Sequence, residues 1–128
     1  MLGEGAGAVT RLLVSGFVPK YTVRAIDAIV GNFCHRRSPA GDADVYLAVY
    51  EIAGHGVTVF EEQPDWSDLS IFRRCPVATF VFVRPRDEWT LWWMDNELGC
   101  FQYPVAATDD LGSLVAVVEE DEHGAFFG

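Results

Sequence analysis

The chain has 128 residues, half of them hydrophobic, and carries a formal net charge of −10 at pH 7. This length suits a single domain with its own buried core, and the apolar content excludes an intrinsically disordered chain. All nine Lys and Arg residues precede Asp87, whereas ten of the nineteen Asp and Glu residues lie from Asp87 onward. Because this acidic C-terminal third offers no basic footprint to a phosphate backbone, nucleic-acid binding is not expected.

Cysteine content and hydropathy indicate the compartment. Cys34, Cys75 and Cys100 are odd in number and widely spaced, which favours reduced thiols over a disulfide framework and predicts a cytoplasmic protein. No segment approaches the ~20 consecutive apolar residues of a membrane-spanning helix. The N-terminal region also lacks the pattern of a secretory signal. We therefore expect no membrane insertion.

The N-terminal region predicts a short lead followed by one helix. Residues 1–18 are rich in glycine at their start and are expected to form a partly ordered lead, with a helical turn at residues 11–14. Residues 19–128 are expected to form a single domain. Its first helix is capped by Thr22 and ends before Pro39. The apolar stripe of this helix consists of Val23, Ile26, Ile29, Val30 and Phe33.

Five β-strands are predicted after this helix, at residues 45–52, 57–62, 77–84, 89–94 and 100–103. Short turns join most of them, which favours an antiparallel meander. Pro64 is expected to end the second strand, because proline cannot donate a hydrogen bond to the ladder, and residues 65–74 are expected to form a loop. The third and fourth strands are apolar on both faces. Since two helices can cover one face only, we expect a homodimer or another protein partner over the other.

The last predicted element is a helix that starts after Thr108, its expected N-cap. Residues 119–122 are all acidic and lie at the negative end of the helix dipole, so we expect the helix to fray there. At least one ring of Phe126 and Phe127 is expected to dock on the sheet or on the first helix. The predicted fold class is α+β: an N-terminal helix, a five-stranded antiparallel β-meander and a C-terminal helix. The stripe of that last helix is predicted to contain Leu111, Leu114, Val115 and Val118.

Four short patterns, in this order and spacing, resemble one family. They are FCxxR from Phe33, FEExPxW from Phe60, WTLWW from Trp89 and DExGxFxG from Asp121. Together they resemble an uncharacterised bacterial domain-of-unknown-function family over nearly the whole chain. The resemblance implies a small α+β domain and assigns no activity. The chain departs from the family at Gln63, where the family tends to have Arg, and around Cys100, where it tends to have Trp.

Glu61 and Glu62 are the strongest candidates for catalysis. As neighbours on a strand they point to opposite faces, so they cannot act together as a carboxylate pair. Either one could serve as a general base beside an arginine in a small-molecule enzyme. The interpretation that we favour is structural: one glutamate is solvated and the other forms an ion pair with an arginine such as Arg73 or Arg84.

Metal and cofactor sites are not predicted. The cysteines and histidines form no CxxC or HxxxH pair, and tetrahedral zinc needs four converging ligands. Cys34, beside His35, is interpreted as a packing residue at the helix end rather than as a nucleophile. We therefore expect no metal and no cofactor.

The function that the sequence favours is a non-enzymatic cytoplasmic module that binds a protein or another ligand. Two alternatives stay open. One is an enzyme that uses Glu61 or Glu62 as general base, and the other is an acidic inhibitor or immunity-type protein directed at a basic partner. The polar and aromatic binding surface is predicted to contain Arg36, Arg37, Glu62, Trp66 and Arg73.

Overall fold

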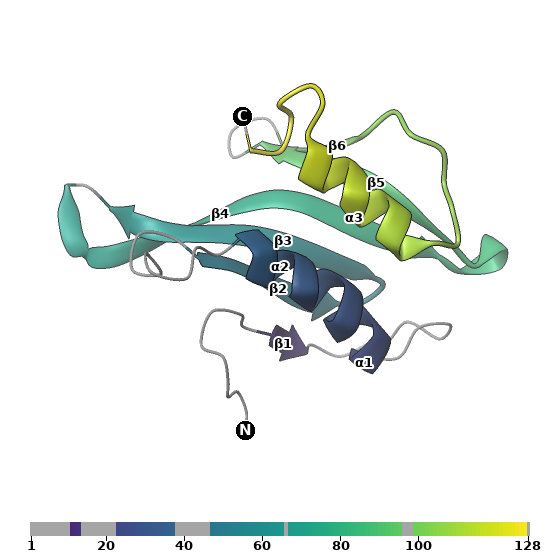
Figure 1. The fold of residues 1–128 in the computed structure, drawn as a ribbon, viewed down its shortest axis with the longest axis horizontal. Coiled ribbons are helices and arrows are strands. Elements are labelled where there is room, and N and C mark those ends of the chain that lie inside the picture. Colours follow the sequence, from purple (N-terminus) through teal and green to yellow (C-terminus); the bar gives the residue numbers. More distant parts are fainter. Residues whose placement is uncertain (1–10, 14–22, 38–46, 66, 96–98, 128) are drawn as a thin grey trace.

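A computed structural model describes residues 11–13, 23–37, 47–65, 67–95 and 99–127 of the chain, beginning with a short strand and one helical region (Figure 1). The helical region has three consecutive segments: α1 (Val23–Ile26), the π-helical η1 (Asp27–Gly31) and α2 (Asn32–Arg37). Ile26, Val30 and Phe33 are buried, as the spacing of the apolar stripe predicts. The expected N-cap, Thr22, lies outside the described residues.

The π-helical turn lies where this region meets β2 (Leu47–Ala53). The hydroxyl of Tyr50 donates a hydrogen bond to the carboxylate of Asp27, the first residue of η1. Gly31 ends the segment, and a Cβ there would lie 3.7 Å from the phenolic oxygen of Tyr50. Because Tyr50 is almost completely buried, its hydroxyl needs a partner inside the protein. Asp27 provides that partner.

In the described residues, six strands form one sheet in the order β1–β2–β3–β4–β5–β6. Strands β2 to β6 are antiparallel neighbours, as in the predicted five-stranded meander, and β1 (Arg11–Leu13) runs parallel to β2. The predicted helical turn at residues 11–14 is wrong, because the backbone of residues 11–13 pairs with β2 instead. The remaining elements are β3 (Gly56–Asp65), β4 (Asp68–Val83), the 3₁₀ turn η2 (Arg84–Arg86), β5 (Glu88–Asp95) and β6 (Gly99–Gln102).

Strands β3 and β4 are longer than predicted and project beyond the rest of the sheet (Figure 1). The predicted stop at Pro64 and the predicted loop at residues 65–74 are wrong, because Pro64 pairs with Phe72 and the ladder continues to the hairpin end. Within the described residues, the pairing of β2 with β3 ends at Glu62. Pro64 therefore lies in a part of β3 that has one strand neighbour, where the missing N–H of proline is tolerated. We call residues 63–65 and 67–75 the β3–β4 arm.

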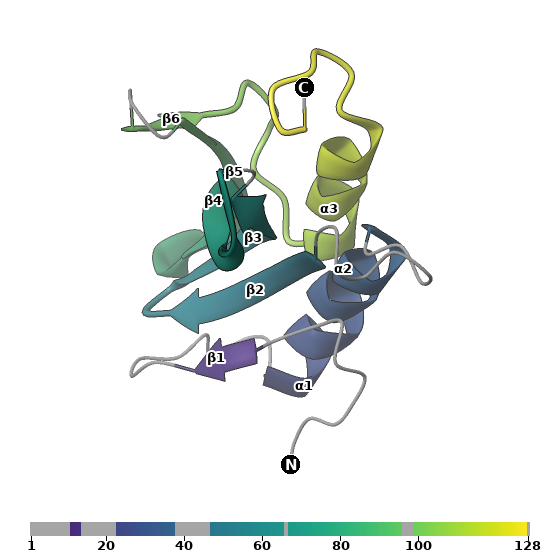
Figure 2. The same ribbon diagram turned by 90° about the vertical axis from the view of Figure 1, so that its left-hand side faces the viewer.

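Both helical regions lie on the same face of the sheet (Figure 2). The second region is α3 (Leu111–Glu120), and its predicted stripe is buried in one core with the first helical region and with alternate strand residues such as Val59 and Phe80. The helix begins after Asp110, so the expected cap at Thr108 is wrong: the backbone of Thr108 forms a bridge to Trp89 instead. Among the described residues, no helix combines the length and the apolar character that crossing a membrane requires.

The second face of the sheet carries threonines among its apolar residues. The hydroxyl oxygens of Thr58 and Thr79 lie 2.9 Å apart across β3 and β4. On β5, the indole N–H of Trp92 donates to the hydroxyl of Thr90 over 3.0 Å. These side chains are half-buried, and their hydrogen bonds are made within the face. The helices thus cover one face, as predicted, and the other is a mixed, partly exposed surface.

The C-terminal tail folds back onto the domain, which confirms the predicted docking of its aromatic rings. Phe126 is buried against Tyr103, with ring centroids 4.9 Å apart. Phe127 lies against Phe33 of α2, with centroids 6.3 Å apart. The carboxylate of Asp121 accepts hydrogen bonds from the N–H groups of Phe126 and Phe127, over 3.0 and 2.9 Å. A single aspartate therefore fixes the turn that returns the tail to the core.

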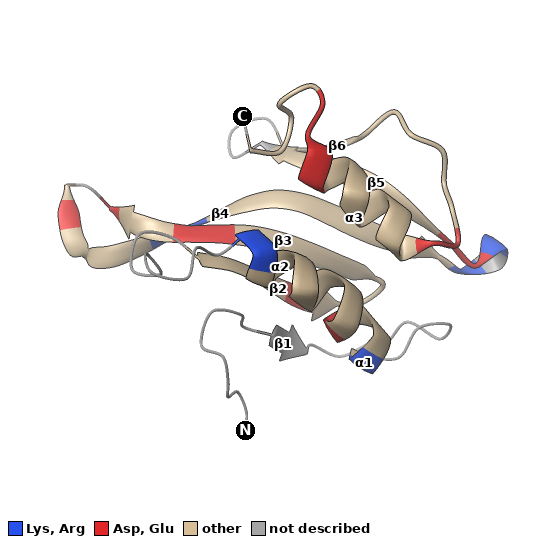
Figure 3. Cartoon of the chain, in the orientation of Figure 1, with Lys and Arg blue, Asp and Glu red and all other residues tan. Residues whose placement is uncertain are grey.

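The acidic end of α3 is paired with the basic end of α2, and Figure 3 shows both ends. Arg36 donates from Nε and Nη2 to the two carboxylate oxygens of Glu119, each over 2.9 Å. This hydrogen bonding raises the pKa of Arg36 and lowers the pKa of Glu119. The predicted fraying from Glu119 onward is wrong for the first two residues, since α3 continues to Glu120. A cation from another helix offsets the unfavourable position of the carboxylate.

Replacing Phe126 with Ala is expected to lower the free energy of unfolding by about 3 kcal/mol, because it removes a buried ring and leaves a cavity. The Phe126 side chain is only 8% exposed. The matched control is Phe101→Ala, whose ring is 39% exposed and whose loss is expected to cost about 1 kcal/mol or less. Urea denaturation followed by tryptophan fluorescence measures both variants. Equal losses of stability would contradict the docked tail.

Candidate functional site

Glu61 and Glu62 lie at the base of the β3–β4 arm, and their side chains point to opposite faces of the sheet, as predicted for neighbours on a strand. Glu61 lies on the helix side, where its carboxylate is 4.0 Å from Nη2 of Arg37 at the end of α2. Glu62 lies on the second face and accepts a hydrogen bond from Nε of Arg74 over 2.9 Å. The two carboxylates therefore belong to separate clusters.

Arg74 binds two carboxylates on the second face. In addition to Glu62, it contacts Glu51 of β2 through Nη1. The strand register places Arg74 opposite Glu62. The predicted ion pair of a glutamate with an arginine is therefore present, but the arginine is Arg74 rather than Arg73 or Arg84, and Glu61 also lies near an arginine instead of being solvated. Because both carboxylates in this cluster are paired with the same guanidinium, the cluster joins β2, β3 and β4 and its role is structural.

Arg37 connects the C-terminal tail with Glu61. Its guanidinium carbon lies 3.7 Å from the ring centroid of Phe127, within the range of a cation–π contact. The Nε atom of Arg37 is buried and has no hydrogen-bond partner in the part of the chain that the structure describes. Burial raises the pKa of the Glu61 carboxyl, and the charge of Arg37 opposes this shift. The attraction of Arg37 therefore does not fully offset the cost of burying the carboxylate.

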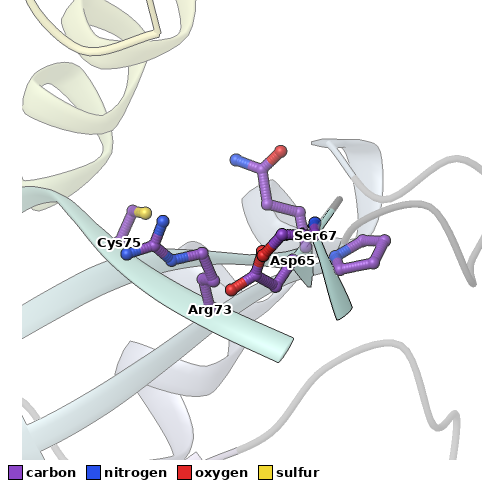
Figure 4. A pocket seen from close by; sticks show the side chains of 6 residues that line it. Asp65, Ser67, Arg73 and Cys75 are labelled. Atoms are coloured by element: carbon purple, nitrogen blue, oxygen red, sulfur yellow. Dashed lines mark hydrogen bonds between the residues drawn. The ribbon is translucent and has the colours of Figure 1, made fainter. Parts of the chain in front are cut away.

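An open cavity of about 320 Å³ lies along the helix side of the arm (Figure 4). Cys75 pairs with Glu61 in the ladder, and Arg73 pairs with Gln63, so the cavity continues the row of side chains that begins at Glu61. At its outer end, hydrogen bonds from Ser67 lower the pKa of the Asp65 carboxyl. The lining consists of Gln63, Pro64, Asp65, Ser67, Arg73 and Cys75.

The outer half of the arm exposes three large apolar side chains. Leu69, Ile71 and Phe72 are 63%, 49% and 51% exposed. Within the described residues, β5 pairs with β4 only from Ala78 onward, so residues 68–77 have a strand neighbour on the β3 side alone. Exposed apolar side chains on an unpaired strand edge are typical of a site of protein association.

The residues predicted as a binding surface do not form one surface. Arg37 lies on the helix side at the base of the arm, and Arg73 lines the cavity beyond it. Glu62 belongs to the opposite face, and Arg36 is bound to the end of α3. Trp66 lies outside the described residues. Of the predicted set, the structure thus assigns Arg37 and Arg73 to the same side of the arm.

Sequence reasoning missed the exposed residues Leu69, Ile71 and Phe72 and the place of Cys75 in the cavity. A signal was present, because Leu69 and Ile71 alternate with the polar residues Asp68 and Ser70, which is a short strand pattern. The preceding proline, Pro64, favoured a loop, so the alternation did not lead to a strand prediction. The exposure itself follows from strand lengths, which the pattern does not contain.

Cys34 is not available as a nucleophile. It is completely buried, and burial raises the pKa of its thiol to about 12, so the thiol stays protonated near neutral pH. In the described ranges, no group of three or more His, Cys, Asp or Glu side chains is arranged to hold a metal ion. The absence of a metal and of a cofactor stays a prediction.

One protein family, described as Domain of unknown function (DUF3024), has a model that matches residues 18–128. The match covers both helical regions and five of the six strands, and it confirms the resemblance to an uncharacterised family. No curated protein and no solved structure matches the chain. The description assigns no activity, so a function has to be argued from the geometry of the arm and its base.

Glu61→Gln is expected to raise the midpoint of thermal unfolding near neutral pH, because the amide lacks the charge whose burial raises the pKa. A carboxyl pKa that is higher in the folded than in the unfolded state makes the folded protein bind the proton more tightly. The free energy of unfolding therefore falls as the pH rises from the unfolded pKa through the folded pKa, and is constant above it. This fall is expected to be smaller in the variant.

Glu62→Gln is the matched control, because its side chain is 25% exposed against 22% for Glu61. It loses part of an ion pair with Arg74 and is expected to be destabilised by up to about 1 kcal/mol. Calorimetry between about pH 4 and pH 8 starts near the ordinary pKa of a glutamate carboxyl and extends above it, the direction in which burial shifts Glu61. A lower melting temperature for Glu61→Gln than for the wild type throughout that range would show that the Glu61 carboxylate is stabilising.

Proposed function

The chain belongs to the family described as Domain of unknown function (DUF3024), and we propose that it is a non-enzymatic module that binds a protein through the β3–β4 arm. The observation that carries this proposal is the exposure of Leu69, Ile71 and Phe72 on one projecting hairpin. Fully burying one such side chain contributes about 1.5–3 kcal/mol. Three half-exposed side chains together therefore offer several kcal/mol to a partner that covers them.

The arm also offers backbone groups to a partner. Residues 68–77 of β4 have a described strand neighbour only on the β3 side. On the outer edge, every second N–H and C=O group therefore points away from the sheet. A strand added at this edge would gain main-chain hydrogen bonds together with the apolar contacts, which is the binding mode known as β-strand addition.

We place this module in the cytoplasm and expect neither nucleic acid nor a membrane as its partner. Its three cysteines are free, which suits a reducing compartment. A net charge of −10 repels a phosphate backbone. Both observations support a soluble protein as the partner of the arm.

A second candidate is a small-molecule enzyme that uses Glu61 as general base. The observation in its favour is the raised pKa of Glu61 beside the cavity of the arm. Glu62, the other predicted base, accepts a hydrogen bond from Arg74 on the face opposite the cavity. The cavity is open to solvent, whereas a typical substrate site buries most of its ligand, so the exposed arm supports protein binding better.

A third hypothesis, an acidic inhibitor or immunity-type protein, rests on the acidic C-terminal third. Several of these carboxylates already have partners within the chain. Glu119 accepts two hydrogen bonds from Arg36, and Asp121 accepts two from the tail backbone. These groups would have to exchange partners to bind a basic protein, so the arm remains the better candidate surface.

A photoreactive amino acid at Leu69 or Phe72 is expected to give a few discrete crosslinked products in living cells, because both side chains project from the arm. The control carries the same group at His123, whose side chain is 70% exposed but belongs to the C-terminal tail. Denaturing gels and mass spectrometry identify the products. Equal products at all three positions, or none from the arm, would contradict the proposed function.

A further inference from the structure

The outer strand of the arm has an ordered distribution of charge. Residues 68–74 read Asp-Leu-Ser-Ile-Phe-Arg-Arg: an acidic residue begins this segment of β4, Leu69, Ile71 and Phe72 lie in its middle, and two arginines end it. Two such strands in antiparallel orientation place the acidic end of each beside the basic end of the other. A parallel arrangement would place like charges side by side, which is destabilising. The strand is therefore complementary to itself in the antiparallel orientation.

We propose that the protein bound by the β3–β4 arm is a second copy of this chain, joined by antiparallel pairing of residues 68–74 of β4 with the same residues of that copy. This inference rests on the proposed function, because it names the partner of the same arm. A two-fold axis between the strands uses the same edge of both copies. The assembly therefore closes as a dimer and covers the edges that would otherwise stay unpaired.

The free edge is long enough for this pairing. Seven residues of a strand span roughly 23 Å at about 3.3 Å per residue. Among the described residues, β5 occupies the same edge only from Ala78 onward, which leaves residues 68–77 without a strand neighbour on that side. Pro76 marks the inner limit of the pairing, because it has no N–H to donate. The pairing joins the sheets of the two copies into one.

The apolar middle of the strand sets the position of the two-fold axis. In an antiparallel pair with this symmetry, one residue lies opposite its own copy. An axis at Ile71 places Asp68 of each copy opposite Arg74 of the other. An axis at Phe72 would place Asp68 opposite Pro76, and an axis at Arg73 would oppose two like charges. The axis therefore lies at Ile71.

Charge also favours the arm over the rest of the surface as the contact between copies. Each copy carries a net charge of −10, so contact through acidic surfaces is repulsive. The arm contains two aspartates and two arginines, so its own net charge is zero, and Arg74 is paired with Glu51 and Glu62. A neutral arm meets less repulsion from an acidic second copy than an acidic surface does.

Sedimentation equilibrium of the purified full chain tests the proposal. The wild type is expected to dimerise with a dissociation constant of about 1–100 µM, as suits a small interface. Ile71→Lys places a charge at the centre of the pairing and is expected to weaken the dimer at least about tenfold. The control, Phe101→Lys, changes another exposed apolar residue, on β6, and is expected to stay within about twofold of the wild type.

Symmetric disulfide formation provides a second measurement, which does not depend on the stability of Ile71→Lys. In a chain with serine at positions 75 and 100, one cysteine is placed at Ile71 or at His123, and the remaining Cys34 is buried. The residue on the axis meets its own copy within cross-strand distance, about 4.5–5.5 Å between Cβ atoms. Oxidation is therefore expected to form covalent dimers at Ile71 at least ~10 times faster than at His123.

Loss of the dimer in Ile71→Lys, or preferential crosslinking at Ile71, supports the pairing. A wild type that stays monomeric up to about 1 mM, or a dimer that Ile71→Lys does not weaken, overturns it. In that case, cellular crosslinks from the arm to a protein of different mass would leave the proposed function standing and exclude only the second copy. The absence of any arm crosslink would remove both.

Discussion

Unequal strand lengths determine where this molecule can act. β4 has 16 residues, yet within the described residues β5 pairs only with the part from Ala78 to Val83, and β2 reaches along β3 only to Glu62. The outer ends of β3 and β4 therefore have only each other as strand neighbours. The open cavity, the unpaired edge of β4 and the exposed apolar side chains all follow from this excess of length. A shorter hairpin would leave a small sheet with helices on one face and no projecting surface.

The base of the arm is fixed by a series of contacts that begins at the C-terminus. Asp121 binds the backbone of the tail and holds Phe127 over the guanidinium of Arg37. Arg37 in turn faces Glu61, whose carboxyl is the group at the arm with a pKa raised by burial. The tail thus contributes to the core and also positions the charge beside the arm. A change that released the tail would alter the electrostatics of Glu61 as well as the stability of the domain.

Hydrophobic periodicity predicted those parts of the fold in which an element buries one face, such as the stripe of α3 and the central strands. It failed at the arm, where the alternating residues Leu69 and Ile71 stay largely exposed. It also failed at Pro64, because a proline interrupts a strand where a neighbouring strand needs its N–H. Among the described residues, Pro64 has a strand neighbour on one side only. Arg37 and Arg73 were predicted as surface residues. The contact of Arg37 with Glu61 was not predicted, because it depends on how α2 packs against the sheet. Strand length, register and packing arise from tertiary contacts that spacing along the chain does not encode.

The central claim is that the outer edge of β4 is free in one copy and paired between two. Amide hydrogen exchange, measured for each residue by NMR at low and high protein concentration, tests it most directly. We predict that amides of residues 68–74 that point away from β3 exchange fast in dilute solution and slow by at least about tenfold as the dimer forms. Amides of the central pair Val57 and Phe80 are predicted to stay protected at both concentrations. Arm amides whose exchange is the same at both concentrations would contradict the account.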